Sequence, residues 1–170
     1  MASFKEHINT WRKYAQSSTQ PEYEDPEVKA GRRAETMLRY IVNGHVKFKG
    51  SHCFTGKRVF NKDLGHKNEI DLIVISDKKL YILECKNWSG RLIKRGNKWV
   101  QIKDRPGQPY KEIEYDDVVK KNEKKLKVLL KYLNKKGFKI SPSGCSQRTI
   151  LMNNNLTIEN KDIYNSEYVI

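Results

Sequence analysis

The stretch EIDLIVISDKKLYILECKN, residues 69–87, decides the fold. It holds two runs rich in Ile, Leu and Val, at 69–76 and 80–87, separated by a short polar segment. Such runs favour β-strands, and a short polar turn between them is typical of an antiparallel hairpin. The sequence therefore predicts two paired strands at the centre of the protein.

The hairpin loop sets which side chains face each other. If residues 77–78 form a two-residue loop, Ser76 pairs with Lys79, and Asp71 then falls opposite Glu84. A four-residue loop gives the same pairing, whereas a three-residue loop shifts the register by one position. Directly opposed residues share one face of the sheet, so the pattern predicts two carboxylates side by side.

A lysine completes this group, because side chains alternate along a strand and Lys86 therefore shares the face of Glu84. Two opposed carboxylates repel each other, and a shared divalent cation would remove that repulsion. Oxygen ligands with open water positions suit Mg²⁺, with Mn²⁺ as a substitute. A metal with a neighbouring lysine can activate water and stabilise charge during phosphodiester hydrolysis. An ordinary cross-strand salt-bridge cluster of Asp71, Glu84 and Lys86 is the alternative.

Further elements are expected on both sides of the hairpin. Upstream, the sequence predicts an amphipathic helix at 3–17, a linker at 17–27, a helix at 27–43, a glycine-rich loop at 43–56, a strand at 58–64 and a turn at 65–68. Downstream, it predicts strands at 91–95 and 98–102 that continue the hairpin into a meander of at least four strands. A loop at 104–109, a helix at 116–136 that stops at Gly137, and a strand at 146–154 follow.

Charge is distributed unevenly along the chain. The 170 residues carry a formal net charge of +14, of which residues 86–139 supply +11, from 17 Lys and Arg against 6 Asp and Glu. A concentrated basic region indicates a polyanionic partner, most often nucleic acid. A charged surface that only keeps the protein in solution is the alternative reading.

Composition also restricts the class of protein. No apolar run approaches 18 residues and the first residues lack an apolar signal region, so we expect neither a membrane span nor a secretory signal. Cys53, Cys85 and Cys145 are far apart and show no CxxC spacing, so we expect plain thiols in the cytoplasm.

Several segments together resemble a known family. GRRAETMLRYIV at 31–42, RVF at 58–60, EIDLIVI at 69–75 and KLYILECKNWSGRL at 79–92 are similar to the nuclease-related domain, NERD. That family belongs to the PD-(D/E)XK, or restriction-endonuclease-like, superfamily. The resemblance covers roughly residues 29–155.

The resemblance implies an α/β fold with an αβββαβ core, in which a central mixed sheet is flanked by helices. It implies that Asp71 and Glu84 are the principal metal ligands, that Lys86 is the catalytic lysine, and that Glu35 is an accessory carboxylate on metal or water. The alternative for Glu35 is an exposed helical glutamate. Residues 1–26 would then be an accessory helix and linker, and residues 27–170 the nuclease domain, with a C-terminus that looks truncated.

One position departs from the family pattern. Members often carry a glutamine early in the long helix after the meander, where this chain has Lys121. A lysine donates hydrogen bonds but accepts none, so it could hold phosphate instead, or the activity could be altered. Cys85 lies between the two catalytic positions and should face the opposite side of the sheet, into the core.

The basic region predicts a surface for nucleic acid. We expect non-specific phosphate contacts from Lys94, Arg95, Lys120, Lys121, Lys124 and Lys125, with an ordinary solvated helix face as the alternative. Trp88 and Trp99 could stack on bases, although packing is the favoured reading.

These features predict a Mg²⁺-dependent DNA endonuclease or nickase of low sequence specificity. A catalytically inactive nucleic-acid-binding module with the same fold is the second hypothesis, and a protein-interaction domain the third. The sequence leaves the oligomeric state open, a dimer included.

Overall fold

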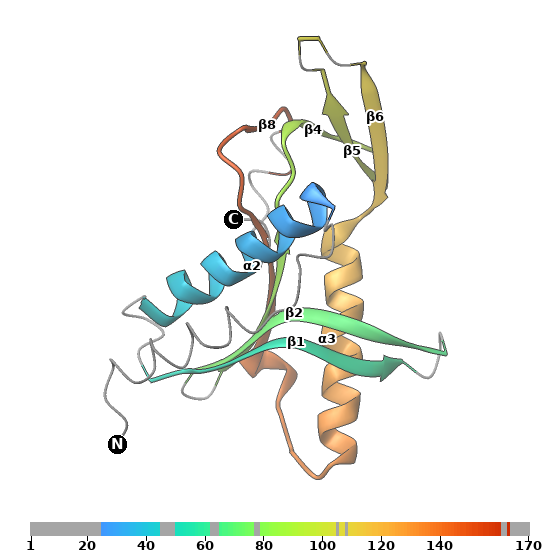
Figure 1. The fold of residues 1–170 in the computed structure, drawn as a ribbon. Helices are drawn as coiled ribbons and strands as arrows, with labels where there is room; N and C mark the ends of the chain where they lie inside the picture. Colours follow the sequence, from blue (N-terminus) through green and yellow to red (C-terminus); the bar gives the residue numbers. More distant parts are fainter. Residues whose placement is uncertain are drawn as a thin grey trace, which may run out of the picture.

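The computed structural model describes residues 25–44, 50–61, 65–76, 79–104, 106–107, 109–160 and 163. The helix predicted at 3–17, most of the linker at 17–27 and the last segment of the chain lie outside these residues. The described part contains two α-helices and two four-stranded sheets (Figure 1).

Helix α2, Pro26–Gly44, confirms the helix predicted at 27–43. Proline suits the first helical position, where its missing N–H is not needed, and the Asp25 side chain accepts the Glu27 N–H at 2.7 Å. Three residues spaced by four, Ala34, Leu38 and Val42, are buried. This spacing gives α2 one apolar face, which packs on the sheet.

Helix α3, Val118–Lys135, confirms the helix predicted at 116–136. Asp117 caps its N-terminus and accepts the N–H groups of Val119 and Lys120. The chain leaves the helix at Gly137, whose φ of +91° suits glycine and is the expected stop signal.

The first sheet, sheet A, contains the hairpin. Its strand order is β1-β2-β3-β7, with β1 His52–Asn61, β2 His66–Ser76, β3 Lys79–Lys86 and β7 Cys145–Leu151. The first three strands are antiparallel, and β7 lies parallel to β3. Parallel pairing requires a long crossover, which here includes α3 and the short 3₁₀ helix Pro142–Gly144.

The second sheet, sheet B, is inserted between β3 and α3 and completed near the C-terminus. Its strand order is β6-β5-β4-β8, with β4 Gly90–Arg95, β5 Lys98–Lys103, β6 Lys111–Asp116 and β8 Leu156–Ile158. The order of elements along the chain is thus αβββ, three inserted strands, then αββ. The prediction of an α/β nuclease-like fold is confirmed, with two mixed sheets in place of one.

The predicted continuous meander is wrong. Strand β3 pairs with β7 and β4 pairs with β8, so the chain changes sheets between Lys86 and Gly90. Parts of the loop at 43–56 and of the turn at 65–68 belong to β1 and β2, and β6 and β8 were not predicted. Local patterns identify strands, but pairing between distant strands depends on contacts that these patterns do not contain.

Both faces of sheet A are covered by helices. One face buries Leu72, Val74, Leu83 and Cys85 against α2. The other buries Ile73 and Ile82, among others, against Leu129 of α3. Because successive residues of a strand point to opposite faces, the near-continuous apolar runs at 70–76 and 80–85 fit a strand covered on both sides.

Candidate active site

The hairpin register agrees with the sequence prediction. Ser76 pairs with Lys79, and the ladder continues to Leu72 opposite Leu83. The same register places Asp71 opposite Glu84, one step beyond the last ladder pair. Beyond Leu72 and Leu83 the two strands no longer pair with each other, and each pairs with its outer neighbour, β1 or β7. We call this end of their pairing the opening between β2 and β3.

The Asp71 carboxylate lies in that opening. Its Oδ2 accepts the backbone N–H of Cys85 at 2.8 Å. A side-chain oxygen thus takes the place of the backbone oxygen that would continue the β-ladder. Burial, followed by the negative charge of Glu84, raises the pKa of Asp71 from 3.8 to about 6. The carboxylate is therefore held in surroundings that disfavour its charge.

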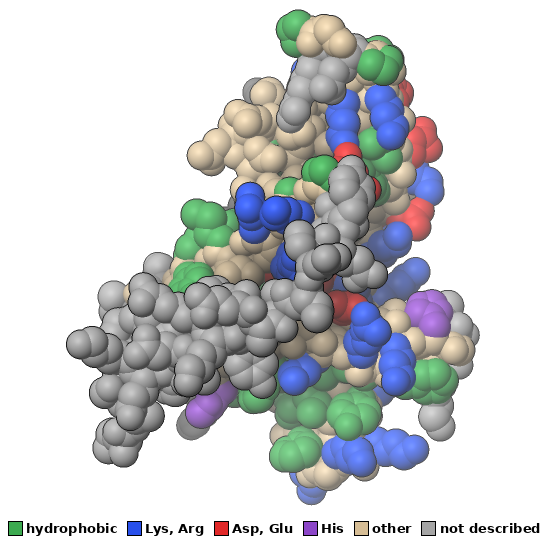
Figure 2. All heavy atoms as spheres, in the orientation of Figure 1, with side chains coloured by type: hydrophobic (Ala, Val, Ile, Leu, Met, Phe, Trp, Pro, Cys, Tyr) green, Lys and Arg blue, Asp and Glu red, His purple; other side chains and the backbone are tan. Residues whose placement is uncertain are grey.

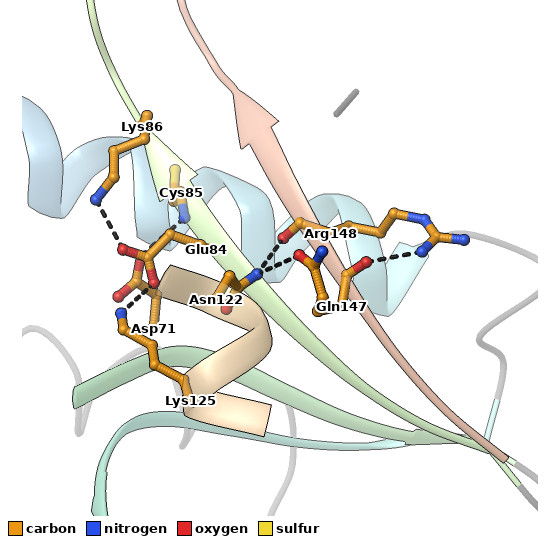
Figure 3. A network of polar contacts seen from close by, with 8 residues as sticks. All are labelled: Asp71, Glu84, Cys85, Lys86, Asn122, Lys125, Gln147 and Arg148. Carbon is orange, nitrogen blue, oxygen red and sulfur yellow. Dashed lines mark hydrogen bonds and ion pairs between the residues drawn. The ribbon is translucent and has the colours of Figure 1, made fainter. Parts of the chain in front are cut away.

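Glu84 is buried, with 8% of its surface exposed, and is held between two lysines. Its Oε1 accepts a hydrogen bond from Lys86 Nζ at 2.7 Å, and its Oε2 accepts one from Lys125 Nζ (Figure 3). Burial acts to raise the pKa of Glu84, but the two ammonium groups outweigh it and hold the pKa below its usual value. Glu84 therefore stays ionised beside Asp71.

Lys86 keeps its proton because of the same contact with Glu84. Burial acts to lower its pKa, yet the charge and hydrogen bond of Glu84 outweigh burial and raise it above the usual value. Its side chain is 28% exposed, and its ammonium group contacts Glu84. The structure thus brings Asp71, Glu84 and Lys86 together as predicted.

Lys125 joins this group from α3. The sequence suggested it as a phosphate contact, and no signal in the sequence pointed to Glu84 as its partner. Lys121, which was expected at the family's glutamine position, instead places its Nζ 3.0 Å from Asp116 Oδ2, and its side chain is 57% exposed. Of these two helix lysines, Lys125 is therefore the one that contacts Glu84.

A buried polar contact positions this part of α3. Asn122, three residues before Lys125, donates to Gln147 Oε1 at 2.8 Å and to the backbone oxygen of Arg148 at 3.1 Å (Figure 3). Both partners belong to β7, the neighbour of β3. Asn122 was not predicted, because a single asparagine in a lysine-rich helix looks like a solvated residue.

Glu35 lies on α2, and its side chain is exposed. Partial burial and the charges of Glu69 and Glu84 raise its pKa, which indicates that it lies near the carboxylate pair. Within the described ranges, however, no three His, Cys, Asp or Glu side chains are close enough together to hold a metal ion. The role of Glu35 as a metal ligand stays a prediction.

Two cavities flank Lys86. One, of about 320 Å³, is lined by Glu84, Lys86, Trp88, Tyr115, Asp116, Val118, Lys121 and Lys125. The other, of about 580 Å³, is also lined by Lys86, Trp88 and Tyr115, and extends to Glu35 and Gly31 on α2. Three of the predicted catalytic residues, Glu35, Glu84 and Lys86, thus border open space large enough for part of a substrate.

The two tryptophans pack as the favoured reading predicted. Trp99 is 2% exposed, and Trp88 stacks on Tyr115 with ring centroids 4.4 Å apart. Cys85 faces the α2 side of the sheet, as expected, and burial raises the pKa of its thiol to about 12. All three cysteines are free thiols.

The residues predicted to bind nucleic acid are mostly paired within the protein. Four of the six form ion pairs, namely Lys94 with Asp117, Arg95 with Glu112, Lys121 with Asp116 and Lys125 with Glu84. Lys120 donates to Asn97, and Lys124 has no ion pair with any residue that the structure describes. Their contact with nucleic acid stays a prediction.

Comparison with known families gives one result. A model of the nuclease-related domain, NERD, matches residues 29–147, which is most of the chain. The chain belongs to the nuclease-related domain family. The match includes most of α2, the carboxylate hairpin, the inserted strands and α3, so the whole candidate site lies inside the domain. No curated protein and no solved structure matches the chain.

Two expectations remain, on membrane spans and on the cellular location of this nuclease-related domain. None of the helices described here has the length and apolar character needed to cross a bilayer. The predicted cytoplasmic location stays a prediction.

Proposed function

We propose that this nuclease-related domain is a metal-dependent nuclease that hydrolyses phosphodiester bonds in DNA. The observation that carries the proposal is the convergence of Asp71 and Glu84 in the opening between β2 and β3, beside Lys86 and an open cavity. Like charges in a half-buried site destabilise a fold, so such an arrangement favours a functional role.

The donor set suits Mg²⁺, or Mn²⁺ in its place. Asp71 and Glu84 supply hard carboxylate oxygens, and Asp71 Oδ1 accepts no hydrogen bond from the described residues. Mg²⁺ commonly uses only one or two protein carboxylates, with water and substrate phosphate as its other ligands. Asp71 and Glu84 would hold the ion, with Glu35 as an accessory ligand. When bound, the ion would activate a water molecule and offset phosphate charge.

The lysines have separate roles in this proposal. Lys86 keeps its proton because Glu84 raises its pKa, so its ammonium group can donate to an attacking water or a phosphate oxygen. Lys125 balances the charge of Glu84 in the protein alone. Once a cation offsets that charge, Lys125 is available to hold a phosphate beside the cavity.

Binding would depend mainly on the DNA backbone. Lys94 and Arg95 lie on β4, and Lys120, Lys121 and Lys124 lie on α3. Exchange of the acids that pair with Lys94, Arg95 and Lys121 for phosphates would make the affinity sensitive to salt. Sequence preference should be low, because phosphate contacts carry no base information.

Cleavage of supercoiled plasmid tests the proposal. The protein should nick or cut plasmid with Mg²⁺ or Mn²⁺ and not with EDTA. Glu84→Gln and Lys86→Met should each lower the rate by roughly a hundredfold or more, the scale of losing one charge-stabilising group. Glu69→Gln, which removes an exposed carboxylate on β2, is the matched control and should keep activity. Intact plasmid with both metals would overturn the proposal.

One observation favours a second function. Both oxygens of Glu84 already accept hydrogen bonds from lysines, which would also stabilise a module that binds nucleic acid without cleaving it. Such a module should show salt-sensitive DNA binding that Asp71→Asn and Glu84→Gln leave unchanged, and no cleavage under any metal. Absence of any binding at about 50 mM salt would instead favour a protein-interaction domain.

A further inference from the structure

A second groove lies away from the carboxylate pair, between the end of β1 and the C-terminal half of α3. Its volume is about 450 Å³, and its walls include Phe60, Val128, Lys131, Tyr132, Lys135 and Lys136. None of these residues belongs to the candidate active site. We call this hollow the aromatic groove.

Two aromatic side chains of this groove are open to solvent. Phe60 is 53% exposed and Tyr132 is 47% exposed. A single exposed ring needs no explanation, but two rings that line one hollow form a surface that water solvates poorly. The aromatic groove therefore offers flat apolar faces to a ligand.

Positive charge accompanies these rings. Lys136 Nζ lies 6.0 Å from the centre of the Tyr132 ring. Lys135 and Lys136 form no ion pair within the ranges that the structure describes, whereas Lys121 and Lys125 of the same helix pair with acids. In the lower part of Figure 2, where the end of α3 lies, hydrophobic side chains adjoin Lys and Arg side chains. A ligand with flat rings and negative charges matches both features.

Helix α3 connects the groove to the active site. Lys121, Lys125, Val128 and Tyr132 follow one another at intervals of four, three and four residues, which places them on one face of the helix. Tyr132 is seven residues beyond Lys125, or about 10 Å along the axis at 1.5 Å per residue. One unpaired strand of a few nucleotides can span this distance.

We infer that the aromatic groove binds unpaired bases of a single-stranded nucleic acid, a few nucleotides from the phosphate at the active site. Exposed aromatic rings stack on bases of any sequence, and adjacent lysines contact the backbone. A duplex keeps its bases stacked inside, so it cannot use these rings. The inference rests on the proposed function and adds a substrate class to it, namely strands with unpaired bases, which include the locally opened segments of a supercoiled plasmid.

Binding without cleavage tests the inference. The full chain is titrated into fluorescent single-stranded dT12 and into a 12-base-pair duplex, in EDTA and about 50 mM salt, and anisotropy gives Kd. Phe60→Ala and Tyr132→Ala remove the rings. Phe54→Ala and Tyr40→Ala are matched controls, since Phe54 also lies exposed on β1 and Tyr40 also lies beside a cation, Arg39. Circular dichroism checks folding, and Tyr132→Phe keeps the ring.

We expect each ring-removing variant to weaken dT12 binding about fivefold or more, while duplex binding changes less than twofold. Both controls and Tyr132→Phe should bind dT12 like the wild type. Equal dT12 affinity for Phe60→Ala, Tyr132→Ala and the wild type would overturn the inference but leave the proposed nuclease intact. Failure of the wild type to bind either oligonucleotide would overturn both.

Discussion

The two sheets place charged residues in opposite ways. In sheet B, acids pair with bases. Lys98 faces Asp116 across β5 and β6, and Arg95 of β4 forms an ion pair with Glu112 of β6. Lys98, Asp116 and Arg95 are about half exposed. In sheet A, Asp71 and Glu84 face each other in a half-buried opening. Both sheets come from one basic chain, so composition does not explain the difference.

The ion pairs of sheet B stabilise a surface, whereas the opposed carboxylates of sheet A form a candidate site. Exposed cross-strand pairs contribute little, typically 0–1 kcal/mol, and require no other function. Opposed carboxylates cost stability, and in sheet A two lysines are needed to offset them. The destabilising carboxylates lie beside a cavity, and for this reason we propose the activity for sheet A and not for sheet B.

The largest effect is expected where the chain passes from sheet A to sheet B. Gly90 has a φ of +88°, and a Cβ there would lie 2.2 Å from the Ile102 backbone oxygen. Gly90→Ala should lower the free energy of unfolding by about 3–5 kcal/mol through backbone strain and overpacking. Urea unfolding measures it. Gly96→Ala, where φ is +59° with nothing within 4 Å, is the control and should cost only about 1–2 kcal/mol.

A smaller effect of opposite sign is expected at Asp71. Its folded pKa, about 6, exceeds the ordinary value of 3.8, so its contribution to stability is full below about pH 4 and is lost as pH rises through 6. Asp71→Asn keeps an oxygen for the Cys85 N–H and removes the charge. Without divalent ions, it should stabilise the protein by about 2–3 kcal/mol at pH 7.5 and by little near pH 4.

Asp116→Asn in sheet B is the matched control for this experiment. Hydrogen bonds from Lys98 and Lys121 lower the pKa of Asp116 to about 2, so its contribution is present above the unfolded pKa and is lost as pH falls. The substitution should therefore destabilise the protein slightly at pH 7.5. If both variants changed stability in the same direction, the distinction between the sheets would fail.

The smallest effect is expected at the surface of sheet B. Glu112 accepts two hydrogen bonds from Arg95, at 2.8 and 3.0 Å, and its partner is about half exposed. Glu112→Gln should change the melting temperature by a smaller amount than any of the other substitutions. The difference in melting temperature from the wild type should disappear in 0.5 M salt, because exposed ion pairs are screened. A large loss that persists in high salt would show that sheet B depends on its charges.

Parts of the structure that depend on local pattern followed from the sequence. The register of Asp71 and Glu84 was predictable because two strands joined by a tight turn can pair in few ways, and alternation then assigns each side chain to a face. The helices α2 and α3 followed from apolar spacing, and the end of α3 followed from Gly137.

The remaining features depend on contacts between segments distant in the chain. Pairing of β3 with β7 brings residues 80–86 against residues 145–151, and this long-range parallel pairing separates the predicted meander into two sheets. The contact of Lys125 with Glu84 requires α3 to lie across β3, and the aromatic groove requires β1 to end beside it. By itself, the sequence determined two facing carboxylates, a neighbouring lysine and a basic helix, because turn length and side-chain period act locally. Only the tertiary structure decided that Lys125 contacts Glu84 and that the rings of Phe60 and Tyr132 line one groove, because both depend on the packing of elements that are distant in the chain.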